Sequence, residues 1–558
     1  MRNHLTPACS GAKLLVRFVP ILLLLLLLTA CGGSSAQPRV VITGPPSISS
    51  LNPTQGGFGA PVTISGTNFG FNTGSVTFNG TTASTPNWTD TSIVAKVPLG
   101  ATTGNVVVTV NGSASNGINF TVVTIPPGTI ANDYFGMQCG AGTEPGTTNC
   151  PNEPGTNTPT WPTSVAQPGL LRLWDSEVSW SYLMTNYSGG TGTYSWAQLD
   201  GFLDDIAANG PIEVNYTFGC VPSFATSGPS GTTPGSCGPN GSASPPNDLG
   251  PGGSPTFTQF VTDLINHCSP NQNCVKDLIT GYELWNEANV SSAMSNYPRW
   301  NGTQTQLYQM VAPAVAYINT HVSNPKIYTP SITGGGGQWM TGWLNAEIAG
   351  GIISNRYNFH TYLNNDTPED VLEGEVVSEL APNTSTNGWT PLPWVVGESS
   401  WDDIALPYGC NDGNTGTQFT TTDCIGQMVR WDILLSSTGG SGLYWYYWNT
   451  NIGSQSSYAQ AYFYMMQYLV GGKLNSACQS SGNTPAVYTC SFTEAGGTGA
   501  QWVWESCPND NNYSSCVAGT SYSVPAGYVD YKDLKGGTTN VSGGQNITVT
   551  VQPILLEK

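Results

Sequence analysis

From about residue 130 to residue 469, short apolar runs typical of strands alternate with longer segments in which apolar residues recur at helical spacing. This alternation predicts parallel strands joined by crossover helices. Eight such units over roughly 340 residues predict a closed (β/α)8 barrel. The eight runs are 134–137, 170–174, 212–217, 280–285, 326–329, 357–360, 394–397 and 442–448.

The helical segments are recognised by the spacing of their apolar residues. In residues 196–206, Trp196, Leu199, Leu203 and Ile206 fall on one face of a helix. The same spacing predicts helices over 257–265, 307–318, 371–380, 425–435 and 458–469. We therefore assign residues 129–475 to the barrel.

The segments on either side of the barrel have a different pattern. Residues 45–124 contain short alternating runs separated by Gly and Asn turns, without a helical segment, which predicts a small β-sandwich. Residues 485–558 return to β runs and predict a C-terminal β-domain, which residues just before the barrel could complete. The clearest strands of the first segment are 62–69, 75–79, 92–97 and 105–110, and those of the last are 501–504 and 546–551.

The N-terminal residues 1–30 have the features of a secretory signal peptide. Lys13 and Arg17 precede the apolar run 21–28, which is too short to span a bilayer comfortably. The sequence Leu-Thr-Ala-Cys that ends at Cys31 resembles a bacterial lipobox. That resemblance implies cleavage before Cys31, a lipid on its sulfur, and an exported protein tethered to the membrane by residues 31–44, facing the periplasm or the cell surface. The alternative is an ordinary signal peptide with a chance cysteine.

The charge of the chain excludes one class of partner. Lys and Arg number 15 against 34 Asp and Glu, so the formal net charge is -19, which argues against binding to nucleic acid. Charged residues make up only 9% of the chain, while there are 17 Trp and 25 Tyr. A neutral, hydroxyl-rich partner such as a sugar suits this composition.

The cysteines indicate an oxidising compartment. When Cys9 and Cys31 are set aside, twelve of the 14 cysteines remain, and they fall as close neighbours along the chain. We predict six local disulfides that hold loops, rather than a metal site, because no Cys-x-x-Cys occurs and histidines are few. The pairs are Cys139–Cys150, Cys220–Cys237, Cys268–Cys274, Cys410–Cys424, Cys478–Cys490 and Cys507–Cys516.

Two predicted strands each end with one carboxylate. Glu287 follows the fourth strand, and Glu398 follows the seventh. Barrel enzymes place reactive groups at these ends, and two facing carboxylates are what cleavage of a glycosidic bond needs. We expect a separation of about 5 to 5.5 Å, the spacing of retaining enzymes. Trp285 and Trp401 should make the pocket partly dry and raise the pKa of Glu287.

The residues around Glu287 carry a specific resemblance. The sequence Trp-Asn-Glu-Ala at 285–288 resembles the Trp-Asn-Glu-Pro signature of clan A glycoside hydrolases, with Ala288 where Pro is usual, and family 39 is the nearest. The resemblance implies that Glu287 is the general acid/base and Glu398 the nucleophile. It also implies substrate-binding residues. These are Arg172 against the nucleophile, Asn286 on the sugar 2-hydroxyl, His360 and Tyr362 hydrogen-bonded at the site, and Trp445 or Trp448 under the sugar ring.

The N-terminal sandwich carries a second resemblance. The segments 48–53, 62–70 and 76–80 resemble the immunoglobulin-like TIG (IPT) module, over its whole length. Because this module contains no acid/base constellation, it implies a spacer or a weak binder of glycan or protein. We favour the spacer.

Other polar residues are interpreted as structural rather than catalytic or metal-binding. Glu283 shares a strand face with Trp285 and is expected to be a structural carboxylate, paired with Arg172. His267 and His321 are expected to be structural. The stretch that starts at Asp412 faintly resembles a calcium loop, but a disulfide-held loop is favoured because it lies between two cysteines.

The sequence therefore predicts a retaining glycoside hydrolase that cleaves a β-linked glycan without metal or organic cofactor. Two alternatives stay open. One is a non-catalytic cell-surface carbohydrate-binding or adhesive lipoprotein on a barrel scaffold, and the other is an inverting hydrolase, which needs a wider carboxylate gap. The sugar, its linkage, and exo against endo action are also open.

Overall fold

The computed structural model describes most of the chain after residue 43. The described residues are 44–98, 100–138, 168–174, 176–209, 213–228, 240–295, 298–363, 366–401, 411–412, 417–418, 420–446, 452, 456–482, 485–506 and 519–558. The predicted signal peptide, Cys31 and most of the predicted tether lie outside these ranges. Within them, no helix is both long and apolar enough to cross a membrane.

Residues 47–122 form the predicted β-sandwich. One sheet has the order β1-β3-β7-β6 and the other β2-β10-β8-β4-β5, with β9 paired to β8. Alternate residues of the long strands are buried, so Val62 and Ile64 of one sheet face Val106 and Val108 of the other. The bounds are β1 Ser47–Asn52, β2 Gln55–Gly56, β3 Pro61–Thr67, β4 Ser75–Phe78, β5 Thr81–Thr82, β6 Asn87–Trp88, β7 Ser92–Lys96, β8 Gly104–Val110, β9 Ser113–Ala114 and β10 Ile118–Val122.

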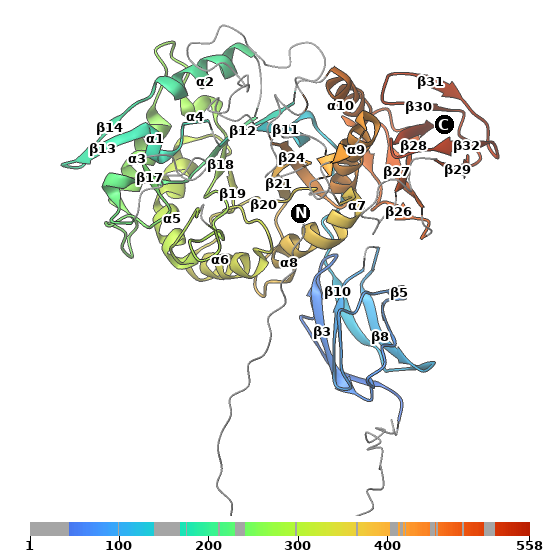
Figure 1. Ribbon diagram of the computed structural model, residues 1–558. Helices are drawn as coiled ribbons and strands as arrows, with labels where there is room; N and C mark the ends of the chain where they lie inside the picture. The colour runs from blue at the N-terminus through green and yellow to red at the C-terminus, as the bar shows by residue number, and fades with distance from the viewer. Residues whose placement is uncertain are drawn as a thin grey trace, which may run out of the picture. The chain divides into compact units, whose positions relative to one another are not determined.

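The eight predicted barrel strands are all present and parallel. Their order is β19-β18-β15-β12-β11-β24-β21-β20, and a parallel bridge between Tyr328 and Arg356 brings the two ends of the sheet together. In Figure 1 these strands occupy the centre of a ring of helices. Their bounds are β11 Phe135–Gln138, β12 Leu170–Leu173, β15 Glu213–Thr217, β18 Gly281–Glu283, β19 Lys326–Tyr328, β20 Tyr357–His360, β21 Trp394–Ser399 and β24 Gly440–Trp445.

Six helical segments were predicted, and each corresponds to observed helix. The segment 371–380 is not one regular helix but a short α-helix, a π-helical turn and a second α-helix. One barrel helix, α6 (Gly337–Gly350), was missed because its start is masked by the glycine run 334–337. The other helices are α1 Trp180–Leu183, α2 Ala197–Asn209, α3 Pro255–Asn266, α4 Val275–Leu278, α5 Gln304–His321, α7 Pro368–Val371, η3 Leu372–Val376, α8 Val377–Ser385, α9 Thr421–Ser437 and α10 Ser456–Leu469. Short pieces complete the barrel: η1 Asn132–Tyr134, β13 Met184–Ser188, β14 Thr191–Tyr194, β16 Val221–Pro222, η2 Ser223–Ala225, β17 Gly241–Ser242, β22 Asn411–Asp412 and β23 Thr417–Gln418.

Successive residues of the barrel strands point alternately into the barrel and towards the helices. Leu170, Tyr328, Val395 and Tyr444 form one small buried cluster from four strands, which we assign to the inside of the barrel. The intervening residues, such as Leu171 and Leu443, belong to the large core under the helices. Arg172, two residues after Leu170, therefore points inwards, one layer nearer the C-terminal ends of the strands.

The C-terminal β-domain contains more strands than were predicted and begins earlier, immediately after α10. Its main sheet has the order β25-β27-β28-β33-β30-β31, β26 pairs with β27, and β29 pairs with β32. Ile130, just before the barrel, exchanges backbone hydrogen bonds with Gly471 and Gly472. The bounds are β25 Lys473–Leu474, β26 Gln479–Ser480, β27 Ala486–Thr493, β28 Gly499–Ser506, β29 Thr520–Ser523, β30 Asp530–Lys532, β31 Thr538–Asn540, β32 Asn546–Val549 and β33 Ile554–Glu557.

Two of the six predicted disulfides are present among the described residues. Cys268 is bonded to Cys274, and Cys478 is bonded to Cys490. Cys220 and Cys424 are also disulfide-bonded. Cys139, Cys150, Cys237, Cys410, Cys507 and Cys516 lie outside the described residues.

A buried charged cluster joins the barrel to the C-terminal domain. The carboxylate of Glu369, on α7, accepts hydrogen bonds from Arg430 of α9 at 3.0 and 3.2 Å. It also accepts one from Trp504 and one from Ser506 of β28, both at 2.7 Å. Glu369 therefore satisfies hydrogen-bond donors from α9 of the barrel and from β28 of the C-terminal domain at the same time.

Removing this carboxylate should destabilise the protein strongly. E369A would leave the Arg430 guanidinium buried without its carboxylate, and breaking a buried pair in this way costs about 3–5 kcal/mol. The free energy of unfolding, measured by urea denaturation, is the readout. The exposed Glu373 on the neighbouring turn provides a matched control, because E373A should change stability by less than about 0.5 kcal/mol. Equal effects of the two substitutions would contradict this role of Glu369.

Candidate functional site

The carboxylates of Glu287 and Glu398 meet at the C-terminal ends of the barrel strands, together with His360. One donor atom from each of the three side chains can be chosen such that all three atoms lie within 4.8 Å of one another. Glu287 follows β18, Glu398 lies near the end of β21, and His360 ends β20. Two strand ends that are about 110 residues apart in sequence therefore bring their carboxylates into one site.

The backbone at Glu287 is held in an uncommon conformation. Its φ is 44°, in the left-handed region that few residues other than glycine adopt. Its N–H donates to Ser331 Oγ at 2.8 Å, and the N–H of Ala288 donates to the Ser331 carbonyl. Strain of this kind persists where the surroundings fix it, commonly at functional sites. Ser331, which follows β19, therefore positions the turn that carries Glu287.

Arg172 connects the residues of the site. Its Nε and Nη2 donate to the two oxygens of Glu283 at 2.8 and 3.0 Å, which confirms the expected pair. Nη1 donates to Glu398 at 2.7 Å, and Nη2 also donates to the Asn286 side chain at 2.7 Å. Burial alone would lower the pKa of Arg172, but the charges of Glu283 and Glu398 raise it overall. Arg172 is thus a permanent buried cation that holds the side chains of Glu283, Asn286 and Glu398, and also that of Gln138.

Glu398 has the partners that were expected of it. Arg172 donates to one carboxylate oxygen, and the Tyr362 hydroxyl donates to the other. His360 Nδ1 lies 3.8 Å from the first oxygen. The side chain of Glu398 is 7% exposed. A buried carboxylate with both oxygens held in this way keeps one orientation in the site.

The surroundings of Glu287 differ from the expectation. His360 Nδ1 lies 3.1 Å from one oxygen, and Arg299 Nε lies 3.5 Å from the other. Burial would raise the pKa of Glu287, but the hydrogen bond and charge of His360, with the charges of Arg299 and Arg172, outweigh it and lower the pKa to about 2. The predicted rise in the pKa of Glu287 is therefore wrong. Arg299 was overlooked because it comes from a loop rather than from a strand end.

The tryptophans of the site have different roles from one another. Trp285 is fully buried, and its Nε1 donates to the Arg299 carbonyl at 2.9 Å, so it fixes the loop that carries Arg299. Trp401 is 3% exposed and meets Trp445 edge to face, with ring centroids 5.0 Å apart. Trp445 belongs to the core under the helices, so its position does not favour it as the platform under a sugar. Trp448 lies outside the described residues.

Three further residues complete the site, and a closer reading of strand ends could have found two of them. Gln138, at the end of β11, accepts a hydrogen bond from Arg172. Thr217, at the end of β15, donates to Glu283 at 3.0 Å. Tyr446, just after β24, packs edge to face against Tyr362 at 6.3 Å. Thr217 ends a predicted strand and Gln138 directly follows one, and barrel sites are built at such positions.

The remaining histidines occupy structural positions, as expected. His267 pairs with Asp200 at 2.6 Å and stacks on Trp196. His321 stacks on Tyr317 at the end of α5, and its Nδ1 lies 2.9 Å from the Tyr317 carbonyl. The side chain of Asp412 lies outside the described residues.

The cluster of Glu287, His360 and Glu398 offers the donor atoms of a metal site, but its charges oppose one. Carboxylate and imidazole ligands suit several divalent cations. Arg172 already occupies one oxygen of Glu398, and Arg299 stands beside Glu287. Two fixed cations next to the candidate ligands disfavour a third positive charge. The arrangement is therefore better suited to acid/base and nucleophilic chemistry.

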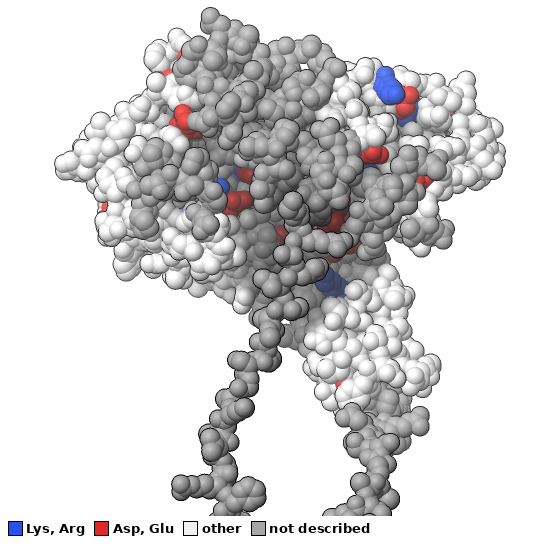
Figure 2. Space-filling view, in the orientation of Figure 1, with Lys and Arg blue, Asp and Glu red and all other residues white. Residues whose placement is uncertain are grey.

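Charged side chains are few on the surface of the protein. Figure 2 shows one face, on which the described surface is largely uncharged, with scattered Asp, Glu, Lys and Arg side chains. The composition, with 9% charged residues, agrees with this view. A surface of this kind suits contact with a neutral partner.

Comparisons with known proteins identify one domain and relate the fold of the chain to others. Residues 46–122 match the IPT/TIG domain family, which confirms the resemblance of the N-terminal sandwich. No curated protein matches the chain.

Among solved structures, a family 39 glycoside hydrolase from Bacteroides cellulosilyticus WH2 is 16% identical, with a TM-score of 0.48, over 92% of this chain and 99% of that one. A glucosidase from Croceicoccus marinus is 13% identical, with a TM-score of 0.48, over 78% and 98%. The catalytic domain of GH30 xylanase C from Talaromyces cellulolyticus is 14% identical, with a TM-score of 0.42, over 70% and 87%.

The low pKa of Glu287 predicts how its contribution to stability depends on pH. A carboxylate with a lower pKa in the folded than in the unfolded chain stabilises the fold above its unfolded pKa, and this stabilisation is lost as the pH falls through the folded pKa. The difference in unfolding free energy between the unmodified protein and E287Q should therefore fall by up to about 3 kcal/mol between about pH 5 and about pH 2. Urea denaturation across this range measures it.

Glu379 provides a control of opposite sign. Burial raises its pKa to about 7, although Gly335 and Gly336 donate backbone hydrogen bonds to it. The unmodified protein should gain stability relative to E379Q as the pH falls from about 7 to about 4.3. For Glu287, the difference in unfolding free energy between the unmodified protein and E287Q could instead stay constant between about pH 5 and about pH 2. That result would show that Glu287 is not held as a carboxylate.

Proposed function

We propose that this protein is a retaining glycoside hydrolase, with Glu398 as nucleophile and Glu287 as general acid/base. The observation that carries the proposal is the close approach of the two carboxylates: one oxygen of Glu287 lies within 4.8 Å of one oxygen of Glu398. Retaining enzymes hold the two groups about 5–5.5 Å apart, whereas inverting enzymes leave about 6.5–9.5 Å for a water molecule. The short distance supports retention and disfavours inversion.

The contacts of Glu398 suit a nucleophile. Arg172 and Tyr362 hold its two oxygens, so one carboxylate orientation faces the site when a sugar enters. Attack by a Glu398 oxygen on the anomeric carbon would form a glycosyl–enzyme ester, while the bond to the leaving oxygen breaks. In the second step, a water molecule deprotonated by Glu287 would attack the same carbon and release Glu398.

Asn286 and Tyr362 are placed to contact the sugar beside this carbon. The Asn286 carbonyl oxygen accepts from Arg172, which orients its amide NH2 group for donation to a sugar hydroxyl. Tyr362 can keep its bond to Glu398 in the free enzyme and weaken it as the ester forms. The proposed roles of Arg172, Asn286, His360 and Tyr362 thus follow from one connected network.

Protonation of Glu287 must accompany binding of the substrate. His360 and Arg299 lower the pKa of Glu287 and hold it as a carboxylate. A sugar that enters between Glu287 and Glu398 excludes water, and this favours the neutral form of an acid next to a second carboxylate. We infer that the leaving-group side of the substrate also loosens the contact between Arg299 and Glu287, which lets Glu287 take up the proton it donates.

The substrate and location are proposed from the same features. The low surface charge supports a neutral β-linked oligosaccharide or polysaccharide. The disulfides agree with an exported protein, and the lipobox-like sequence supports attachment to the membrane through Cys31. In this arrangement residues 31–44 and the IPT/TIG domain act as a spacer between the membrane and the barrel.

A purely binding role for the barrel is the competing proposal. A site that only binds sugar needs no second carboxylate within reach of the first, and no buried arginine that fixes it. Burying the charged groups of Arg172, Glu283 and Glu398 costs free energy because they lose their contact with water. Its completeness favours the catalytic role.

Substitution of the nucleophile tests the proposal. E398Q should reduce turnover of an activated aryl β-glycoside by at least about a thousandfold, because no ester intermediate can form. A screen of aryl glycosides and soluble polysaccharides first identifies the substrate, and release of the aryl group gives the rate. E373Q, on the exposed turn near α7, is the matched control and should retain full activity. Comparable activity of E398Q and the control would refute the assignment of Glu398.

Substitution of the acid/base tests the stereochemistry. E287A should slow substrates with poor leaving groups far more than activated aryl glycosides, which need little protonation. Added azide should restore the rate with activated substrates and yield a β-glycosyl azide, the product of net retention, which proton NMR of the anomeric position identifies. An α-glycosyl azide, or hydrolysis with inversion in the unmodified enzyme, would instead indicate the inverting mechanism.

A further inference from the structure

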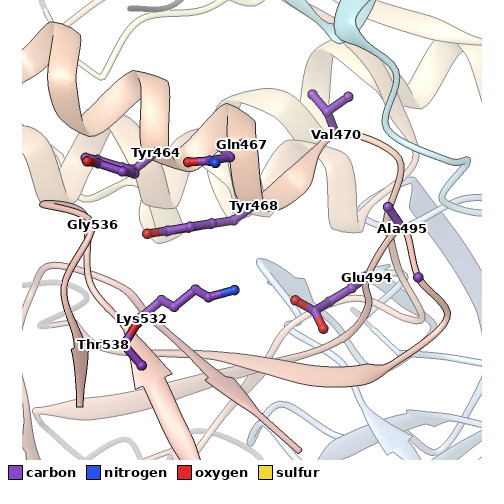
Figure 3. Close-up of a pocket in the computed structure, with 10 residues that line it drawn as sticks. Tyr464, Gln467, Tyr468, Val470, Glu494, Ala495, Lys532, Gly536 and Thr538 are labelled. Atoms are coloured by element: carbon purple, nitrogen blue, oxygen red, sulfur yellow. The ribbon is translucent and has the colours of Figure 1, made fainter.

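A second pocket lies away from the carboxylates, between α10 and the C-terminal β-domain. Its volume is about 510 Å³, within the range of about 300–1,000 Å³ that is typical of small-molecule sites. Figure 3 shows Tyr464 and Tyr468 projecting from α10 on one side. The side chains of Lys532 and Glu494 approach from the opposite side, with their polar ends turned towards each other.

The walls of this pocket are held in place. The Tyr468 hydroxyl donates to the Asp533 carbonyl at 3.1 Å, and its ring lies against Tyr464 with centroids 6.0 Å apart. Asp533 in turn accepts from the N–H groups of Lys535 and Gly537, which fixes the turn after β30. Gly536 packs so closely on Tyr464 that a Cβ there would come within 2.3 Å of the ring. The aromatic wall is therefore formed before any ligand arrives, which reduces the entropy cost of binding.

The polar side of the pocket is formed by charged side chains that pair with one another. Lys532 Nζ pairs with Glu557 at 2.5 Å and lies 5.4 Å from the centre of the Tyr468 ring. Glu494, on the turn between β27 and β28, neighbours the same pair, and burial together with the hydrogen bond to Glu557 raises its pKa to about 7. The pocket thus combines an aromatic wall with ammonium and carboxyl groups that can donate and accept hydrogen bonds.

This combination selects one class of ligand. A metal ion is disfavoured because the Lys532 ammonium already pairs with the carboxylate of Glu557. A phosphate or other anion is disfavoured because Lys532, the cation among the described lining residues, is paired with Glu557 and has Glu494 nearby, and the chain carries a net charge of -19. An apolar ligand would bury Lys532 and Glu494 without partners. A sugar ring offers an apolar face for an aromatic wall and hydroxyls for the charged groups.

We propose that this pocket is a second, non-catalytic carbohydrate-binding site, which takes one or two units of a neutral oligosaccharide against Tyr468, Lys532 and Glu494. Gln467, exposed at the rim, adds an amide that can donate to and accept from hydroxyls. The proposal does not depend on the barrel hydrolysing the same glycan. It gives the C-terminal domain a role in holding a polysaccharide chain near the barrel.

The test uses the full mature chain carrying E398Q, so that no substrate is consumed. Native gels containing soluble β-glucan, arabinoxylan, glucomannan or galactan identify the glycan that retards it most. Isothermal titration with the matching hexasaccharide then counts binding sites. Adding Y468A should remove one site, or weaken it at least about tenfold. Y468F keeps the ring and should retain that site, and Y528A, which removes a tyrosine of the same domain that does not line the pocket, should have no effect.

A blocking variant keeps the test valid if Y468A reduces folding. Gly496 lines the pocket, and a Cβ built there meets nothing within 4 Å, so G496W can fill the entrance without disturbing the core. Its thermal unfolding should match that of the parent, and it should lose the same site. Unretarded migration in every gel, or an unchanged number of sites in both Y468A and G496W, would overturn the proposal.

Hydrolysis is assayed separately from binding, so either proposal can be refuted while the other is kept. An active wild-type enzyme whose binding does not depend on Tyr468 keeps the catalytic proposal and refutes the second site. Binding that depends on Tyr468, in a protein that cleaves none of the glycans, keeps the second site and refutes the catalytic proposal.

Discussion

The architecture of the barrel mouth depends on the buried guanidinium of Arg172. Four side chains from the ends of three strands, β11, β18 and β21, converge on it: Gln138, Glu283, Asn286 and Glu398. A buried cation is tolerated only when its donors are satisfied, so each partner is needed to keep the others in position. The carboxylate of Glu398 and the amide of Asn286 are thereby oriented by one group rather than independently. The same charge also contributes to the low pKa of Glu287.

The electrostatics of Glu287 bear on its proposed acid/base role. His360 and Arg299 favour its charged form. An acid/base residue has to change its protonation state during turnover, so an environment that fixes one state must be altered by the substrate. Arg299 stands on a loop outside the strands, which is the part of a barrel where such an adjustment costs least.

Much of this fold could be predicted from the sequence, because the strands and most helices follow hydrophobic periodicity. The eight strand runs and both glutamates were placed by that pattern and by the rule that barrel sites lie at strand ends. Helix α6 was missed because its glycine-rich start hides a helical face. The pKa of Glu287 was wrongly predicted because it depends on distances of 3.1 and 3.5 Å to His360 and Arg299. The local pattern of apolar residues does not predict distances between separate segments of the chain. It does not predict the pocket beside α10 either.

The position of Glu369 restricts how this protein could have been assembled from parts. Helix α7, which carries it, begins a few residues after Tyr362, and its carboxylate binds both Arg430 of the barrel and Trp504 of the C-terminal sheet. A barrel cut away from that sheet would expose the side of the cluster that binds Trp504, close to Tyr362, which is hydrogen-bonded to Glu398. Because Glu369 satisfies donors on both sides, we expect the barrel and the C-terminal sheet to be inherited together, as a single evolutionary unit.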